Sequence, residues 1–265
     1  MQLPLYQVDA FASAPFQGNP AAVVPLQAWL PDNILQAIAE ENHLSETAFL
    51  VRSPADGAYD LRWFTPAAEV DLCGHATLAS AYVVRRFLEP GAAEMHFQTR
   101  SGRLVVHADG DRLRMDLPAH RAEPADPPPA LSKALGHNIL HFGHAAYDMA
   151  VLAAAGDVAS LRPDMRALTA HGAPLIVTAR AAEGSGLDFV SRFFAPTLGV
   201  PEDPVTGSAH CTLAPYWSDT LGREELRAAQ LSARGGQLLC RVQTDRVHIT
   251  GQAVLVIEGT LHLPG

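Results

Sequence analysis

The amino-acid sequence predicts an α+β protein built from two similar lobes, and three observations support this prediction. The stretch Glu202–His210 has the design of the stretch Glu69–Thr77: an acidic residue, a small or polar residue, a Gly, and a Ser or His that opens an Ala-rich run. Each stretch follows an aromatic segment that carries an Arg and ends in Pro, at 60–66 and 188–196. The length of 265 residues allows two domains. A repeated strand-loop-helix unit implies two half-molecules of one plan.

Each half is predicted to be a mostly antiparallel β-sheet wrapped around a central α-helix, which gives two pseudo-symmetric lobes. The first lobe is expected at 1–118 and the second at 119–265, with the option that the last strand packs back on the first lobe. The proline-rich segment 119–130 is expected to be the crossover between the halves.

In the first half, alternating apolar residues predict strands, and an apolar spacing of three to four residues predicts helices. Ile34, Leu35, Ile38 and Ala39 give one helix its apolar face, and Glu89-Pro90-Gly91 ends the other. The expected elements are strands at 3–9, 44–51, 58–64, 94–99, 102–109 and 111–117, helices at 31–42 and 75–87, and an ordered loop at 11–20.

The second half is expected to repeat this plan. Its central helix at 208–221 carries Leu213, Tyr216 and Trp217 on the apolar side, and a second helical stretch is expected at 157–169. Strands are expected near 138–144, 147–153, 174–179, 187–194, 229–233, 237–243, 245–250 and 253–260.

Composition excludes several classes of partner. With 19 Lys and Arg against 28 Asp and Glu, the net charge of −9 disfavours nucleic acid. The amino-terminal stretch lacks the features of a secretory signal, and the most apolar later stretch, 149–155, is too short to span a bilayer. We therefore expect a cytoplasmic protein without a membrane segment. Three cysteines without CxxC spacing indicate neither a disulfide framework nor a structural zinc site.

Glu46 is a candidate general acid/base because it lies at the head of an apolar strand, where burial would raise the pKa of a carboxylate toward the useful range. The alternative is a solvent-facing residue or an ion pair. Gly74 lies at a predicted helix start, where free N–H groups favour an anion such as a substrate carboxylate. Asn19 is a candidate substrate contact, and its alternative role is to form a tight turn.

Three histidines, His137, His141 and His144, would share one helical face and could then bind a metal ion. Gly136 and Gly143 instead favour strand and turn, which place these side chains on both faces. We therefore predict no metal site here.

The motifs taken together resemble one known family, the PhzF-like (phenazine biosynthesis PhzF) proteins, which are relatives of diaminopimelate epimerase. The resemblance covers nearly the whole chain. It rests on Asp9-Ala-Phe with Gly18-Asn19-Pro20, Leu44-Ser-Glu-Thr-Ala-Phe49, Phe64-Thr-Pro66, Cys73-Gly-His-Ala-Thr77 and Glu202-Asp-Pro-Val-Thr-Gly-Ser-Ala209.

The resemblance implies a two-lobed fold whose two central helices point their amino ends into a cleft, as a homodimer that acts on a small molecule without a cofactor or metal. It also implies site roles. Glu46 matches the proton-shuttling carboxylate, and the other matches are partners for substrate and proton (His75, Asp203, Ser208), backbone donors (Gly74, Gly207) and substrate-binding positions (Asn19, Cys73, Thr206).

Departures from the relatives restrict the chemistry. Diaminopimelate epimerase uses a thiol at each helix start. Here Cys73 occupies the first thiol position, but Thr206 occupies the second, and a hydroxyl is a poor proton acceptor. One carboxylate that moves a proton on a single face suits the isomerisation for which the family is known, and a racemase using Glu46 and Cys73 remains an alternative. The stretch Leu231–Gly236 also differs from other members, so the phenazine-pathway substrate is not transferred to this chain.

Two alternatives come from other function classes. A hydrolase could use Ser208 with His75 or His210 and Asp203, although the G-x-S-x-G elbow is missing. A non-catalytic binding protein on the same fold is the other alternative.

Overall fold

The computed structural model describes residues 1–54 and 57–263 of the chain. It divides into two compact units, unit 1 with Met1–Asp116 and Thr250–Gly265, and unit 2 with Leu117–Ile249. The sequence places the boundary after residue 118, close to this division. The last strand, assigned from sequence to the second lobe, lies in unit 1, because β18 (Ala253–His262) pairs antiparallel with β1 (Gln2–Ala10).

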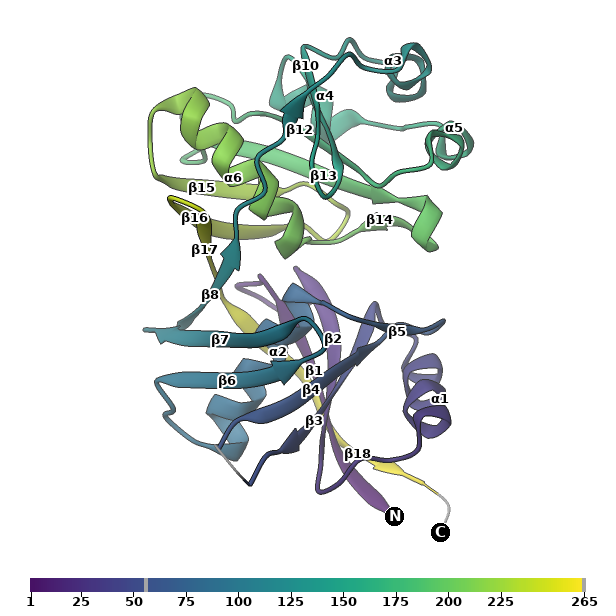
Figure 1. Cartoon of the computed structure of the whole chain (residues 1–265), viewed down its shortest axis with the longest axis vertical. Helices are drawn as coiled ribbons and strands as arrows, with labels where there is room; N and C mark the ends of the chain where they lie inside the picture. Colours follow the sequence, from purple (N-terminus) through teal and green to yellow (C-terminus); the bar gives the residue numbers. More distant parts are fainter. Residues whose placement is uncertain (55–56, 264–265) are drawn as a thin grey trace. The chain divides into compact units, whose positions relative to one another are not determined.

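Unit 1 is a mostly antiparallel sheet with one buried helix, α2 (Figure 1). Its remaining elements are β2 (Asn19–Leu26), α1 (Asp32–Asn42), β3 (Glu46–Arg52), β4 (Tyr59–Phe64), β5 (Glu69–Val70), α2 (Gly74–Val83), the π-turn η1 (Val84–Leu88), β6 (Glu94–Thr99), β7 (Gly102–Asp109) and β8 (Arg112–Pro118), the last of which crosses the boundary.

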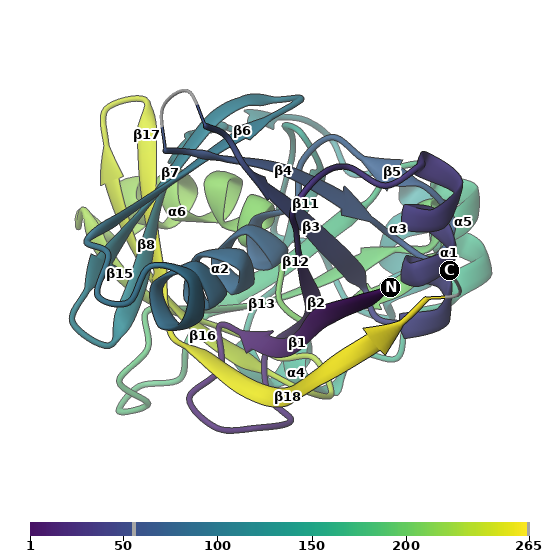
Figure 2. The same ribbon diagram turned by 90° about the horizontal axis from the view of Figure 1, so that it is seen from below.

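Helix α2 is the centre of unit 1. Nearly all of its side chains are buried, and most of them are Ala, Leu, Val, Ser or Thr, small enough for strands to pack closely on several sides. The helix packs against β1, β2, β3 and β18 (Figure 2). None of the helices in the described part of the chain has the length and apolar character needed to cross a bilayer.

Unit 2 is built in the same way around α6. Its elements are β9 (Glu123–Pro124), α3 (Pro129–Leu135), β10 (His141–His144), β11 (Asp148–Val151), α4 (Ala155–Ser160), α5 (Met165–His171), β12 (Leu175–Arg180), β13 (Phe189–Ala195), the 3-10 turn η2 (Pro196–Leu198), β14 (Val200–Asp203), α6 (Gly207–Leu221), β15 (Glu225–Gln230), β16 (Gly236–Gln243) and β17 (Arg246–Gly251), the last of which crosses the boundary.

The order of strand pairing is the same in both units. In unit 1, β2–β3 and β4–β6 are parallel, and the connecting segments contain α1 and α2. In unit 2, β11–β12 and β13–β15 are parallel, and the connecting segments contain α4 with α5, and α6. The other corresponding pairs, such as β3–β4 and β12–β13, are antiparallel. The internal repeat is therefore a duplication of topology.

The duplication extends to a side-chain contact. Arg62 on β4 binds both carboxylate oxygens of Glu69 through Nε and Nη2, at 2.7 and 2.8 Å. Arg192 on β13 binds Glu202 through the same atoms, at 2.6 and 2.8 Å. Such bidentate pairs fix planar geometry. The acidic residue that opens each repeat therefore joins the aromatic strand to the next short strand.

Several elements differ from the sequence-based expectations. Strand β2 was missed because Pro20 and Pro25 lower the strand signal, although its backbone pairs with β1 and β3. Strand β15 lies at 225–230, earlier than the expected 229–233. The stretch 157–169 forms two helices, α4 and α5, with Pro163 between them. Helix α3 begins inside the predicted crossover.

Gly18 immediately precedes β2 and has a φ of +66°. A Cβ atom there would lie 2.1 Å from the carbonyl oxygen of Ala10, so the backbone would have to move. We expect Gly18→Ala to lower the free energy of unfolding by about 2–4 kcal/mol, from left-handed strain plus the clash. Gly184→Ala is the matched control, because φ is +78° and no atom lies within 4 Å. Equal losses in urea titrations of both variants would contradict this prediction.

Candidate active site

Glu46 and His75 form the centre of the candidate site in unit 1. Glu46 opens β3, and its side chain is 17% exposed. His75 is the second residue of α2, and its Nε2 lies 2.9 Å from Oε2 of Glu46. The oxygen is buried and the contact lacks the alignment of a hydrogen bond, so this is a pairing by charge. Oε2 therefore remains able to accept a proton.

Asn19 orients the imidazole. It is fully buried at the start of β2, and its Nδ2 lies 3.2 Å from Nδ1 of His75. An amide nitrogen only donates, so with the amide placed this way Nδ1 accepts. The charged ring that Glu46 favours needs the amide oxygen of Asn19 at this position instead. Asn19 thus has a positioning role toward His75, besides the substrate contact predicted from sequence.

Cys73 is the N-cap residue of α2, and its Sγ lies 3.4 Å from Nδ1 of His75. Burial, together with the nearby Glu46 carboxylate, raises the pKa of the Cys73 thiol to about 11. The thiol is therefore protonated at neutral pH and is a weak base.

The pKa of His75 lies well above its usual value. Burial alone would lower it, but Cys73 and Glu46 raise it. The contribution of Cys73 requires a thiolate, and that thiol is neutral at pH 7, so the Glu46 carboxylate is the partner that matters. The structure thus brings Glu46, His75, Cys73 and Asn19 together, next to Gly74 at the helix start.

Unit 2 has a different group at the corresponding helix start. Thr206 is the N-cap of α6, as Cys73 is of α2, and Gly207 follows it. Its hydroxyl donates to Oδ2 of Asp203 and accepts from Nε2 of Gln230 at 3.2 Å. Its N–H donates to Oε1 of Gln230 at 2.9 Å. Thr206 is held in this network and does not replace a catalytic thiol.

Ser208, the second residue of α6, is the counterpart of His75. Its hydroxyl lies 3.1 Å from the hydroxyl of Tyr147. Nδ1 of His210 lies 2.8 Å from the carbonyl oxygen of Thr206, and because a carbonyl only accepts, Nδ1 donates this hydrogen bond. In the part of unit 2 that the structure describes, Ser208 contacts Tyr147, His210 contacts the Thr206 carbonyl and Asp203 contacts the Thr206 hydroxyl, so the hydrolase hypothesis gains no support.

His210 predicts a pH dependence of stability. The ring is fully buried, and burial lowers its pKa to about 4, although the Thr206 carbonyl opposes this. A lowered folded pKa favours the neutral ring, so stability is lost as the pH falls below about 6.5 and the loss levels off below about 4. The expected loss is about 3 kcal/mol at 1.36 kcal/mol per unit of pKa. Urea titrations from pH 7 to pH 4 should show a smaller loss in His210→Gln. An equal loss in both proteins would contradict the assignment.

The three histidines considered as metal ligands have separate contacts. His137 lies 3.8 Å from Asp157, His141 stacks on Tyr216, and His144 Nδ1 lies 2.5 Å from Asp148. His141 and His144 lie on a strand, as the flanking glycines predicted.

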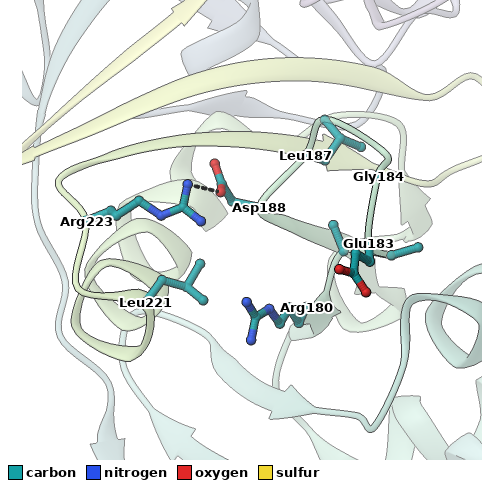
Figure 3. A pocket seen from close by; sticks show the side chains of 9 residues that line it. Arg180, Glu183, Gly184, Leu187, Asp188, Leu221 and Arg223 are labelled. Atoms are coloured by element: carbon teal, nitrogen blue, oxygen red, sulfur yellow. Dashed lines mark ion pairs between the residues drawn. The ribbon is translucent and has the colours of Figure 1, made fainter.

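A surface pocket of unit 2, of about 410 Å³, lies beside the end of α6 (Figure 3). Its walls include Arg180 and Glu183, and Arg223 forms an ion pair with Asp188 at 3.0 Å. None of the site residues predicted from sequence lines it, and of its two carboxylates Asp188 is paired with Arg223. We therefore assign it no part in proton transfer.

Two residues of the unit 2 network were missed from sequence. Gln230 lies at the end of β15 and Tyr147 directly before β11, far along the chain from Thr206 and Ser208. No local motif marks either residue, because each reaches its partner only through the folded sheet.

The two repeated units, each a mostly antiparallel sheet around one helix, define the class of proteins with the diaminopimelate epimerase-like fold. A hydroxyproline epimerase from Agrobacterium vitis shares this fold with a TM-score of 0.61, at 11% identity over 98% of this chain and 92% of that one. The chain belongs to the PhzC-PhzF family, described as phenazine biosynthesis-like protein, whose sequence pattern matches residues 8–259. The predicted fold class and family are thus confirmed.

Relatives agree with the predicted enzyme class. A Pseudomonas aeruginosa protein with the name "uncharacterized isomerase" is 52% identical over 99% of this chain and 100% of its own length. A human phenazine biosynthesis-like domain-containing protein is 40% identical over 98% and 99%. The crystal structure of a PhzF family protein from Enterococcus faecalis matches with a TM-score of 0.95, at 44% identity over 99% and 100% of the two chains.

Proposed function

We propose that this protein is a cofactor-independent isomerase in which Glu46 moves a proton within a small substrate that carries a carboxylate. The observation that carries the proposal is the pairing of Glu46 with His75. Nε2 lies 2.9 Å from the buried Oε2, while the carboxylate side chain stays 17% exposed, within reach of a substrate. A general base needs a free lone pair within reach of a carbon-bound proton. The names of the close relatives support the isomerase class.

The proposed mechanism has two proton transfers by one group. Glu46 takes a proton from carbon, and His75 stabilises the carboxylate before this step. The substrate becomes an enolate- or dienolate-like anion, and Glu46 returns the proton to another carbon on the same face. The free N–H groups at the starts of α2 and α6 would bind the substrate carboxylate and the developing charge.

The residues of unit 2 have proposed roles in the same reaction. Asp203 would assist proton movement, and Ser208 would donate a hydrogen bond to the substrate. Gly207 would offer its N–H group, and Thr206 would hold Asp203 in place through its hydroxyl. We also propose that the protein is cytoplasmic and forms a homodimer. Light scattering of the purified protein would test the dimer.

A racemase is the second candidate, because Cys73 lies close to His75 and could act on the opposite face of the substrate. Inversion of a stereocentre needs a second group that exchanges protons readily. The pKa of the Cys73 thiol, raised by burial to about 11, disfavours it as the base at neutral pH. The one-base isomerase is therefore the preferred mechanism.

Proton NMR in deuterated water tests the proposal. A panel of small unsaturated amino and hydroxy acids is incubated with the purified protein, and deuterium incorporation into each carbon position is followed. A shifted double bond is the expected result, with deuterium at the second carbon because the proton held by the partly exposed Glu46 exchanges with solvent before its return. Exchange at a single stereocentre with loss of optical purity would favour the racemase. Bound ligands without exchange would favour a binding protein.

A further inference from the structure

The candidate site in unit 1 contains three side chains of the kinds that bind transition metals. Among the described residues, Glu46, Cys73 and His75 form the group of three His, Cys, Asp or Glu side chains whose ligand atoms all lie within 4.8 Å of one another. The thiol and the imidazole are buried, and the Glu46 carboxylate is partly exposed. A small ion could therefore reach the group from the Glu46 side.

The distances are close to those of a tetrahedral zinc site. Zinc bonds of about 2.3 Å to sulfur and about 2.0–2.2 Å to nitrogen or oxygen place neighbouring ligand atoms about 3.3–3.6 Å apart. Here Sγ of Cys73 lies 4.0 Å from Nε2 of His75, and Nε2 lies 2.9 Å from Oε2 of Glu46. The Sγ to Oε2 distance is at most 4.8 Å, so side-chain movements of up to about 1 Å would give the ideal geometry.

The donor atoms favour a transition-metal ion such as zinc over magnesium or calcium. Sulfur and imidazole nitrogen are ligands of zinc, whereas magnesium and calcium prefer oxygen alone. Oε2 of Glu46 is a buried oxygen without a hydrogen bond, so it is available as the third ligand. Nδ2 of Asn19 lies next to the other ring nitrogen, Nδ1. After a half-turn rotation of this amide group, its oxygen accepts a hydrogen bond from Nδ1–H.

We propose that Glu46, Cys73 and His75 form a zinc-binding site that inhibits the enzyme. Zn²⁺ binds Oε2, Sγ and Nε2 and keeps its fourth position for water or a substrate anion. Cys73 loses its thiol proton and the charged His75 loses its Nε2 proton to the solvent as the Zn–S and Zn–N bonds form, and no electron is transferred. Glu46 is then held by the metal ion, which withdraws charge from the carboxylate and makes it too weak a base to take a proton from substrate. Only the inhibition rests on the proposed function, since binding is independent of it.

Cobalt binding tests the site without any substrate. Co²⁺ added to the metal-free protein should give a thiolate-to-cobalt charge-transfer band and tetrahedral d–d bands at one equivalent, and Zn²⁺ should remove them. Cys73→Ser and His75→Gln should weaken binding at least ~100-fold, because even the loss of an outer-shell group costs 10–100-fold. Circular dichroism checks that these variants fold.

Matched controls exclude other sites. Cys240→Ala removes a buried thiol elsewhere, and His144→Gln removes the exposed member of the His144–Asp148–His171 cluster. Both should bind cobalt like the wild type. Absence of the thiolate band, or its loss in either control, would overturn the proposal.

Calorimetry of the wild type gives a second readout that needs no variant. Zinc binding in two buffers of different ionisation enthalpy should release about two protons, one from the Cys73 thiol and one from the charged imidazole of His75. Zinc should also stop turnover, and a chelator should restore it. Binding without inhibition would overturn the inhibitory role. If no substrate is turned over, the cobalt and calorimetric results still decide whether the site binds zinc.

Discussion

Replacing Glu46 by Gln is expected to reduce turnover by about 10²- to 10⁴-fold, the usual contribution of a positioned general base. Gln has the size and shape of Glu but no proton-accepting carboxylate, so the packing at the start of β3 should be retained. The measurement is the rate of deuterium incorporation, together with kcat and KM. A fall in kcat with a nearly constant KM is expected, because the proton transfer and not binding is removed.

Glu41→Gln is the matched control for this substitution. Glu41 lies near the end of α1 and is exposed, so the same chemical change there should leave kcat unaltered. The thermal midpoints of both variants should stay close to that of the wild type. Undiminished turnover in Glu46→Gln would remove Glu46 from the mechanism.

Arg192→Met is expected to have the largest effect on stability. The side chain of Arg192 is 9% exposed and binds Glu202 through two hydrogen bonds. It also donates to the carbonyl oxygen of Leu161 at 2.9 Å. Its removal leaves the largely buried carboxylate of Glu202 without these bonds, which costs about 3–5 kcal/mol for such pairs. Urea and thermal unfolding measure the loss.

Two comparisons test whether the unpaired, largely buried carboxylate of Glu202 causes the loss of stability. Arg121→Met breaks an ion pair with Asp219 in which both side chains are more than half exposed, and should cost less than about 1 kcal/mol. Adding Glu202→Leu to Arg192→Met should restore part of the lost stability, because the buried charge is then removed. A single-variant loss no larger than that of Arg121→Met would contradict the structural role.

The acidic residues of the repeats illustrate how function and structure divide. Glu69 and Glu202 are the acidic residues that open the two repeated stretches. From sequence alone, an acidic residue at the start of such a motif could be a catalytic carboxylate. Both instead bind an arginine of the preceding strand. Glu46 has no acidic counterpart in the repeat. Thr47 pairs with Phe64 as Leu175 pairs with Phe194, so Pro174 takes the place of Glu46 in unit 2. Glu46 is the carboxylate that pairs with an imidazole.

The sequence by itself determined the parts of this protein that local patterns encode. The repeat predicted two lobes, the apolar periodicity predicted most helices and strands, and the glycines predicted the starts of α2 and α6. Glu46 was a candidate from its place at the head of an apolar strand, and its predicted catalytic role came from the resemblance to the PhzF-like family. These features depend on neighbouring residues and on backbone preferences, which are readable along the chain.

The tertiary structure alone decided which side chains meet. Glu46 contacts His75 across 29 positions, Thr206 binds Gln230, and β18 pairs with β1 from the opposite end of the chain. The tertiary structure also buried Cys73, which raises the pKa of its thiol and makes it a poor base. Such contacts and desolvation arise only when the strands pair around the central helix, because no local spacing specifies them.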